Sequence, residues 1–202
     1  MQERRTHTAI VLCFVALAFF TWLDLWTKSL AVDALSCVPD GSFECRSLRG
    51  MERGRGEAHV LIDNYLELRY AENRGAAFGM LHDAPAWVRS LIFTGAASIA
   101  TGALLWMFIT GAGGPLFAWS VPLVVSGALG NMVDRWRLGY VVDFIRLHVG
   151  NSWEWPTFNV ADSTITVGVV LLLLDGILNP QSAARGTEGS RGPSRVGDAG
   201  RP

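Results

Sequence analysis

The sequence contains few charged residues for a chain of its length. Only 17% of its 202 residues are Asp, Glu, Lys or Arg, whereas a soluble domain has about 25%. These charges crowd into residues 40–74 and the tail after residue 185, and long tracts between them carry none. Because half of the residues are hydrophobic, the shortage of charge excludes an ordinary soluble domain and indicates a polytopic membrane protein.

The sequence also has no excess of positive charge, since its formal net charge is −1. A protein that binds nucleic acid needs a basic surface to neutralise phosphates, so we expect no nucleic-acid partner. Cysteine is scarce, with three residues. Cys13 lies in an apolar tract and is interpreted as a packing residue. Cys37 and Cys45, with seven residues between them, could form a disulfide in an oxidising compartment.

Four apolar tracts are long enough to cross a membrane. Residues 90–109 and 111–133 contain no charge, and at about 1.5 Å per helical residue each covers the roughly 30 Å of a bilayer's hydrocarbon core. Residues 9–23 and 163–174 are shorter uncharged cores. We predict a mainly α-helical protein with four transmembrane helices, at about 8–30, 88–109, 113–138 and 159–178, which together make one domain over residues 1–178.

The segments outside these spans differ in character. Residues 35–86 form a long loop, and residues 179–202, rich in Gly, Ser, Pro, Arg and Ala, are expected to be a disordered tail. Arg4 and Arg5 before the first tract also resemble the start of a cleaved signal peptide, but Asp24 and Lys28 at its end argue against cleavage. Arginines on both sides of the spans leave the orientation in the membrane undecided.

Two segments outside the spans alternate between apolar and polar residues. Leu66 to Tyr70 and Phe144 to Val149 have the period of half-buried strands. We therefore predict a small sheet that rests on the membrane surface.

Two aspartates stand beside the apolar tracts, where a carboxylate is costly. Asp143 follows the third span, and Asp162 stands at the start of the fourth. An ionisable group near hydrocarbon indicates function, and two carboxyls that share one site are the device of aspartic proteases. Each aspartate is thus the candidate partner of the other.

Other polar residues near the span ends have structural as well as functional interpretations. Asp134 and Arg135 share a helix face with Asn131, and could simply form an ion pair. Asn159 and Asp162 are three residues apart, as in a helix N-cap with an acidic first turn. Asp24 and Lys28 have the spacing of a helical ion pair, which would lower the cost of burying them. These alternatives remain open from the residues alone.

A stretch of small residues follows the first predicted strand, from Asn73 to Met80. It has the freedom of a mobile flap, with Gly75 supplying backbone flexibility, Asn73 offering both donors and an acceptor to a peptide backbone, and Phe78 packing at the lipid boundary. The alternative is an ordinary turn from strand to helix.

Taken together and in this order, these motifs resemble lipoprotein signal peptidase, also called signal peptidase II. The matching residues are Asp24-x-x-x-Lys28, Asn73-x-Gly75-Ala76-Ala77-Phe78, Gly130-Asn131-x-x-Asp134-Arg135, Val142-Asp143-Phe144 and Phe158-Asn159-x-Ala161-Asp162. The resemblance covers roughly residues 10–178. The arginine-rich part of the 35–60 loop and the extended tail depart from the family's pattern without touching the motifs.

The resemblance implies an inner-membrane aspartic endopeptidase that removes signal peptides from diacylglyceryl-modified prolipoproteins, cutting before the lipidated cysteine. It implies Asp143 and Asp162 as catalytic residues, and it implies that the other matched residues line and order the site. It also implies cytoplasmic termini, with the 35–86 loop and the site on the periplasmic side. We expect no metal and no cofactor, the prolipoprotein and membrane lipid as partners, and a monomer.

Two other classes of protein also place acids in a membrane. A proton-coupled transporter or channel uses them as a relay, and a non-catalytic scaffold uses polar groups to hold helices together. Four short spans without broken-helix repeats speak against the first. The sequence otherwise contains no Ser/Lys or Cys/His constellation near a membrane boundary that would serve hydrolysis better.

Overall fold

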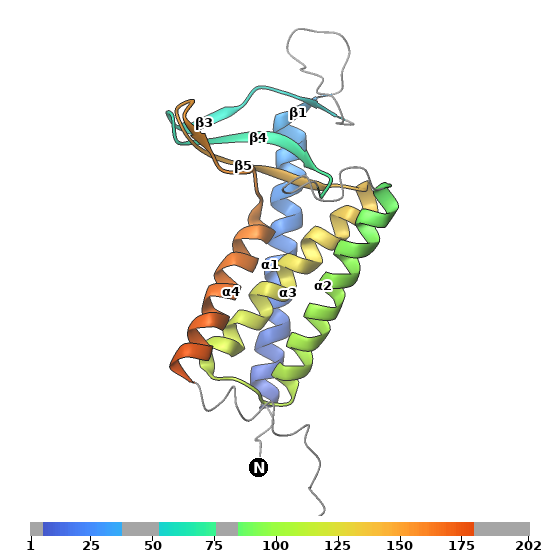
Figure 1. Ribbon diagram of the computed structural model, residues 1–202, viewed down its shortest axis with the longest axis vertical. Coiled ribbons are helices and arrows are strands. Elements are labelled where there is room, and N and C mark those ends of the chain that lie inside the picture. The colour runs from blue at the N-terminus through green and yellow to red at the C-terminus, as the bar shows by residue number, and fades with distance from the viewer. Residues whose placement is uncertain (1–5, 38–52, 76–84, 180–202) are drawn as a thin grey trace, which may run out of the picture.

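The computed structural model describes residues 6–37, 53–75 and 85–179. Four long apolar helices run side by side, and a small antiparallel sheet covers one end of them (Figure 1). All four are long and apolar enough to span a membrane. The first residues of α1 and the last residues of α4 lie at the end of the bundle away from the sheet (Figure 1).

The helices fall on the four apolar tracts of the sequence. They are α1 (His7–Leu35), α2 (Ala86–Ile109), α3 (Pro115–Leu138) and α4 (Val160–Leu178). The first helix is longer than expected, because Ala31 and Leu35 continue its buried face into a cluster with Tyr70, Tyr140 and Phe144 under the sheet. Packing against the sheet therefore extends α1 beyond its apolar core.

The sheet has four strands in the order β3-β4-β5-β6, with every neighbouring pair antiparallel. The strands are β3 (His59–Ile62), β4 (Leu66–Asn73), β5 (Val141–Val149) and β6 (Trp153–Glu154), and a separate pair is formed by β1 (Ser36–Cys37) and β2 (Gly54–Arg55). Both predicted strands are present, and this confirms the small sheet.

Both long strands extend past the alternating residues that predicted them. The added residues pair Asn73 with Val141 and Ala71 with Asp143. The first four residues of β5 are all buried, so alternation disappears there and the pattern could not mark the strand's start. This extension brings the end of β4 beside Asp143.

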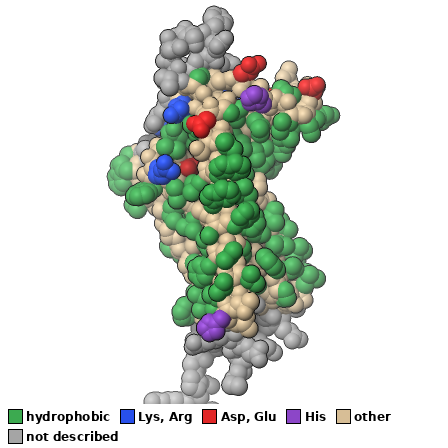
Figure 2. Space-filling view, turned by 180° about the vertical axis from the view of Figure 1, so that it is seen from behind, with side chains coloured by type: hydrophobic (Ala, Val, Ile, Leu, Met, Phe, Trp, Pro, Cys, Tyr) green, Lys and Arg blue, Asp and Glu red, His purple; other side chains and the backbone are tan. Residues whose placement is uncertain are grey.

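The third helix is the centre of the bundle and packs against each of the other three. Its contact with α4 is close because residue 127 is glycine: a Cβ at that position would collide with the backbone oxygen of Ala161. The outer surface of the helices is dominated by hydrophobic side chains, whereas the acidic and basic side chains visible in Figure 2 gather at the sheet end. Such a surface suits a bilayer around the helices.

Three of the sequence-based predictions lie outside the described residues. They are the position of Phe78 and the rest of the predicted flap, the pairing of Cys45, and the order of the tail beyond Asn179.

Candidate active site

The site forms where the sheet meets the helices, at the end of α3 and the start of α4. Gly139 ends α3 with a left-handed φ of 77°, a conformation that glycine adopts without steric cost. Four residues later, β5 holds Asp143 with only 2% of its surface exposed. The helix end thus turns the chain so that a carboxyl group is buried beside the first turn of α4.

Asp162 belongs to the cap of α4. The side chain of Asn159 accepts a hydrogen bond from Asp162 N at 3.0 Å, and Asp162 Oδ2 accepts one from Asn159 N at 3.3 Å. This is a capping box, which confirms the cap interpretation. The cap does not exclude a functional role, because the Asp162 carboxyl remains partly exposed.

The Asn159 side chain also joins the two aspartates. Its Nδ2 donates to Asp143 Oδ1 at 2.7 Å, while its Oδ1 accepts from the backbone of Asp162. Two further amides complete the set: Asn131 Nδ2 donates to Asp162 Oδ1 at 2.8 Å, and Asn73 Nδ2 donates to Asp143 Oδ2 at 3.0 Å. Each carboxyl group therefore accepts two N–H hydrogen bonds, and three asparagines fix the pair.

The surroundings of Asp143 favour its protonated form. Burial, followed by the nearby charge of Asp162, raises the pKa of Asp143 to about 7, against the opposing effects of the Asn73 and Asn159 hydrogen bonds and of Lys28. A carboxyl with such a pKa can hold a proton near neutral pH and act as an acid.

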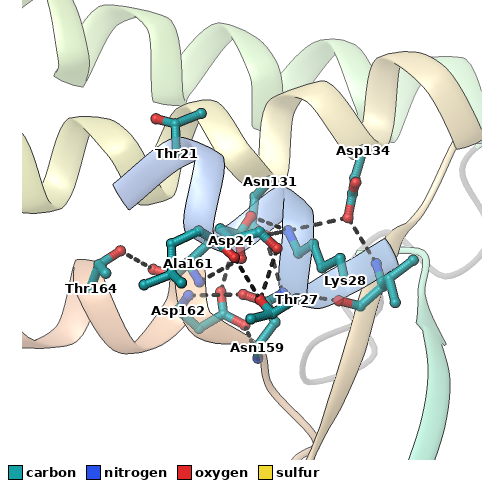
Figure 3. Close-up of polar contacts among 12 residues, drawn as sticks. Thr21, Asp24, Thr27, Lys28, Asn131, Asp134, Asn159, Ala161, Asp162 and Thr164 are labelled. Carbon is teal, nitrogen blue, oxygen red and sulfur yellow. Dashed lines mark hydrogen bonds and ion pairs between the residues drawn. The ribbon is translucent and has the colours of Figure 1, made fainter. Parts of the chain in front are cut away.

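A buried lysine lies at the centre of the polar contacts that support the pair (Figure 3). Lys28 Nζ is 2.8 Å from Asp24 Oδ2 and 3.1 Å from Asp134 Oδ2, and it donates to Asn131 Oδ1 at 2.9 Å. The Asp24–Lys28 ion pair is confirmed. The predicted Asp134–Arg135 pair is wrong: Asp134 pairs with Lys28 because both point into the protein.

The two acids bound to Lys28 also hold the backbone around the site. Asp24 Oδ1 accepts from Ala161 N in the first turn of α4 at 2.8 Å, and Asp134 Oδ2 accepts from Val142 N at 3.1 Å. Ala161 and Val142 each precede one of the two aspartates. One lysine with two carboxylates therefore ties α1, α3, α4 and β5 together.

Arg135 and the turn after β4 meet at an aromatic ring that belongs to none of the sequence motifs. The Arg135 guanidinium carbon lies 5.5 Å from the ring centre of Phe93 in α2. Gly75, at φ 81°, packs against the same ring, and its N–H donates to Asn73 Oδ1 at 2.9 Å. Phe93 carries no polar group in an apolar span, so no sequence pattern marked it.

The described residues contain no group of His, Cys, Asp and Glu side chains arranged to hold a metal ion. The site does offer two carboxyl groups, linked through Asn159, for acid–base chemistry.

The fold and the site define a polytopic membrane protein that holds a linked pair of carboxyl groups at one end of a four-helix bundle. The family model described as "Signal peptidase (SPase) II" matches residues 15–178. The chain belongs to the signal peptidase II family, and it is a bacterial multi-pass membrane peptidase.

Several relatives carry the name lipoprotein signal peptidase. The one from Cupriavidus pinatubonensis is 42% identical over 75% of this chain and 81% of its own length, and that from Chromobacterium violaceum is 36% identical over 77% and 94%. Among solved structures, a bacterial membrane enzyme superposes with a TM-score of 0.63 at 25% identity, over 86% of this chain and 96% of the other. The fold predicted from the sequence is thereby confirmed.

Proposed function

We propose that Asp143 and Asp162 are the catalytic pair of this signal peptidase. The observation that carries the proposal is the position of the Asn159 side chain between the two aspartates. Its Nδ2 donates to Asp143 Oδ1, and its Oδ1 accepts from the backbone N–H of Asp162. Three amides orient two carboxyls that no cation directly neutralises among the described ion pairs. Such an arrangement keeps both groups reactive.

The difference in burial between the two aspartates assigns the roles of acid and base. Asp162, partly exposed, is the ionised carboxylate that takes a proton from a water molecule, and the water oxygen attacks the scissile carbonyl carbon. Asp143, protonated through its raised pKa, donates its proton to the carbonyl oxygen. In the second half, the proton held by Asp162 passes to the leaving amine nitrogen as the C–N bond breaks. The diol then returns a proton to Asp143, and the pair regains its starting state.

The substrate follows from the family, whose members remove signal peptides from prolipoproteins. We assign to this chain cleavage before the lipidated cysteine of diacylglyceryl-modified prolipoproteins. A site at the sheet end of the helices supports this, because a lipid-modified residue lies at the membrane boundary. Exposed Trp153 and Trp155 on and beside the sheet suit contact of its outer part with lipid headgroups.

Cys37 supports an orientation of the protein in the membrane, because this residue follows α1 on the sheet side and is disulfide-bonded. Disulfides persist in oxidising compartments such as the periplasm and not in the bacterial cytoplasm. The sheet and the site therefore face the periplasm, and both termini face the cytoplasm. The site draws its carboxyls and their amide partners from one chain, which supports a monomer. Membership of a peptidase family sets aside the transporter and scaffold alternatives.

The test is replacement of each carboxyl by the amide of the same shape. Asp143→Asn and Asp162→Asn should each lower turnover of a diacylglyceryl-modified prolipoprotein by about 10²–10⁴-fold, the usual contribution of an acid or base. Purified protein in detergent is assayed, and melting curves check that each variant is folded. Asp175→Asn, a buried aspartate at the other end of α4, is the matched control and should retain activity. Near-normal turnover by either of the first two variants would sink the assignment.

A further inference from the structure

The second helix contributes one described side chain to the surroundings of the site. Phe93 lies between the turn after β4 and the end of α3: the edge of its ring faces Gly75, where a Cβ would stand 2.7 Å from Phe93 Cε2, and the Arg135 guanidinium carbon lies 5.5 Å from the ring centre. This is the geometry of a cation–π contact. The ring thus contacts Gly75 and Arg135, which belong to two of the motifs around the Asp143–Asp162 pair.

Arg135 is a cation near two carboxyls with which it does not form an ion pair among the described residues. Its charge interacts with Asp162 and Asp143, yet its one described hydrogen bond runs from Nη1 to the backbone oxygen of Asn131, at 3.3 Å. A guanidinium has five N–H donors and binds carboxylates readily. The contacts that hold the guanidinium elsewhere are its hydrogen bond to Asn131 O and the ring of Phe93.

We propose that Phe93 is a positioning residue that holds the Arg135 guanidinium away from the Asp143–Asp162 pair, so that the pair keeps the proton it needs. The inference rests on the proposed catalytic role of these carboxyls. The ring attracts the guanidinium to its face, and Gly75, which has no side chain, leaves space for the edge of the ring. Without the ring, Arg135 closes on a carboxylate, and a direct ion pair lowers the pKa of a carboxyl by about 1–3 units.

A substitution of Phe93 leaves the other charges around the Asp143–Asp162 pair in place. They are Asp24 and Lys28 from α1, Asp134 from α3, and the Glu72–Arg74 ion pair at the end of β4. Arg89 is the one charged residue in the α2 sequence, and its side chain lies outside the described ones. A change at Phe93 therefore acts on the pair through Arg135.

The experiment compares Phe93→Leu, which removes the aromatic face, with Phe93→Tyr, which keeps it. In Phe93→Leu the alkaline limb of kcat/KM should move to lower pH by about one unit or more, because Asp143 loses its proton earlier. In Phe93→Tyr the alkaline limb of kcat/KM should stay at the same pH as in the unsubstituted protein. Leu91→Ala, on the same helix with its side chain 66% exposed, is the matched control and should also leave it in place.

A second readout does not depend on activity. The infrared carbonyl band of the protonated Asp143, assigned by its loss in Asp143→Asn, is titrated in detergent. The pH at the midpoint of this titration should fall in Phe93→Leu. It should return to the value of the unsubstituted protein when Arg135→Gln is added, because the displaced cation is then absent. A Phe93→Leu protein with lower activity but unchanged limb and midpoint, or a shift that persists with Arg135→Gln, would overturn the proposal. Activity retained by Asp143→Asn would instead refute the catalytic pair.

Discussion

Asp143 and Asp162 accept the same number of N–H hydrogen bonds but differ in burial. Asp143 is 2% exposed, whereas Asp162 reaches solvent. Burial disfavours a charged carboxylate, so in the proposed mechanism Asp143 is the group that carries the shared proton. The difference in environment would then give two chemically identical side chains opposite tasks.

This difference predicts how activity depends on pH. The pKa of Asp143 is raised to about 7, and its protonated form is the active one, so kcat/KM should fall about tenfold per pH unit above 7. Below pH 7 the activity should reach a plateau. Initial rates at low substrate, from pH 4 to 9, measure the profile. A rate that kept rising above pH 8 would contradict the assignment of Asp143 as the acid.

The same raised pKa also affects stability. In the unfolded chain a carboxyl ionises near its ordinary value of 3.8, and in the folded protein Asp143 ionises only near 7. Folded Asp143 therefore binds a proton that the unfolded chain has released, and stability falls as pH rises between these two values. The site is maintained at a cost in stability, which the buried contacts of the surrounding helices offset.

At the scale of elements, α4 is anchored at both ends by aspartates with different partners. Its first turn is bound to α1 through Asp24 and Ala161 N. In its last turn Asp175 Oδ2 accepts from Gly114 N at 2.8 Å, and Oδ1 accepts from Asn179 at 3.1 Å. Gly114 is the N-cap of α3 and has no capping side chain of its own, so Asp175 supplies the cap from a neighbouring helix.

We predict that Asp175→Ala destabilises the protein without changing its chemistry. The part-buried Gly114 N–H would lose its hydrogen bond to the Asp175 carboxyl group, and the loss of such a bond costs about 1–3 kcal/mol. The free energy of unfolding, measured by titration with a denaturing detergent, should fall by this amount. Activity of the folded fraction should stay within about twofold, because the residue is at the end of α4 away from the site.

Asp33→Ala serves as the control for this prediction. Asp33 is an exposed aspartate in α1, and surface substitutions of this kind usually change stability by less than about 0.5 kcal/mol. Equal stability of the two variants would mean that the turn before α3 does not depend on Asp175.

At the scale of the whole molecule, the sheet and the helix bundle face two different environments. The helices carry an apolar surface (Figure 2), whereas β4, β5 and β6 carry a network of ion pairs on alternate residues: Arg146 pairs with Glu67 and Glu154, both at 2.8 Å, and Arg69 pairs with Glu154. Arg146 holds the pKa of Glu154 at about 2. One face of the sheet therefore carries charged side chains paired with one another.

The orientation of the molecule gives a prediction for its cysteines. A membrane-impermeant thiol reagent, added to cells with a permeabilised outer membrane, should label Cys37 only after reduction of its disulfide. Cys13 is a free thiol with 5% of its surface exposed, and it should stay unlabelled throughout. Because reduction of the disulfide frees two thiols, Cys37→Ser should remove only the share of the label that Cys37 carries. Labelling of Cys37 only after the inner membrane is lysed would place the sheet in the cytoplasm and reverse the proposed topology.

The sequence by itself determined the four helices, the two long strands and the cap of α4. These features depend on local properties: the length of an apolar tract, alternation along Leu66 to Tyr70, and the three-residue spacing of Asn159 and Asp162. Each such signal lies within one segment, so it can be interpreted without knowing which other segments are near. The resemblance to a family indicated in addition that the separate motifs belong to one site.

Only the tertiary structure decided which polar groups meet. Adjacent Asp134 and Arg135 suggested a pair, yet Asp134 binds Lys28, more than a hundred positions away, while Arg135 lies over Phe93. A buried charge takes the partner that packing brings to it, because in a medium of low dielectric an unpaired charge is costly. Helix packing sets these distances between remote segments, and no local pattern in the sequence contains them.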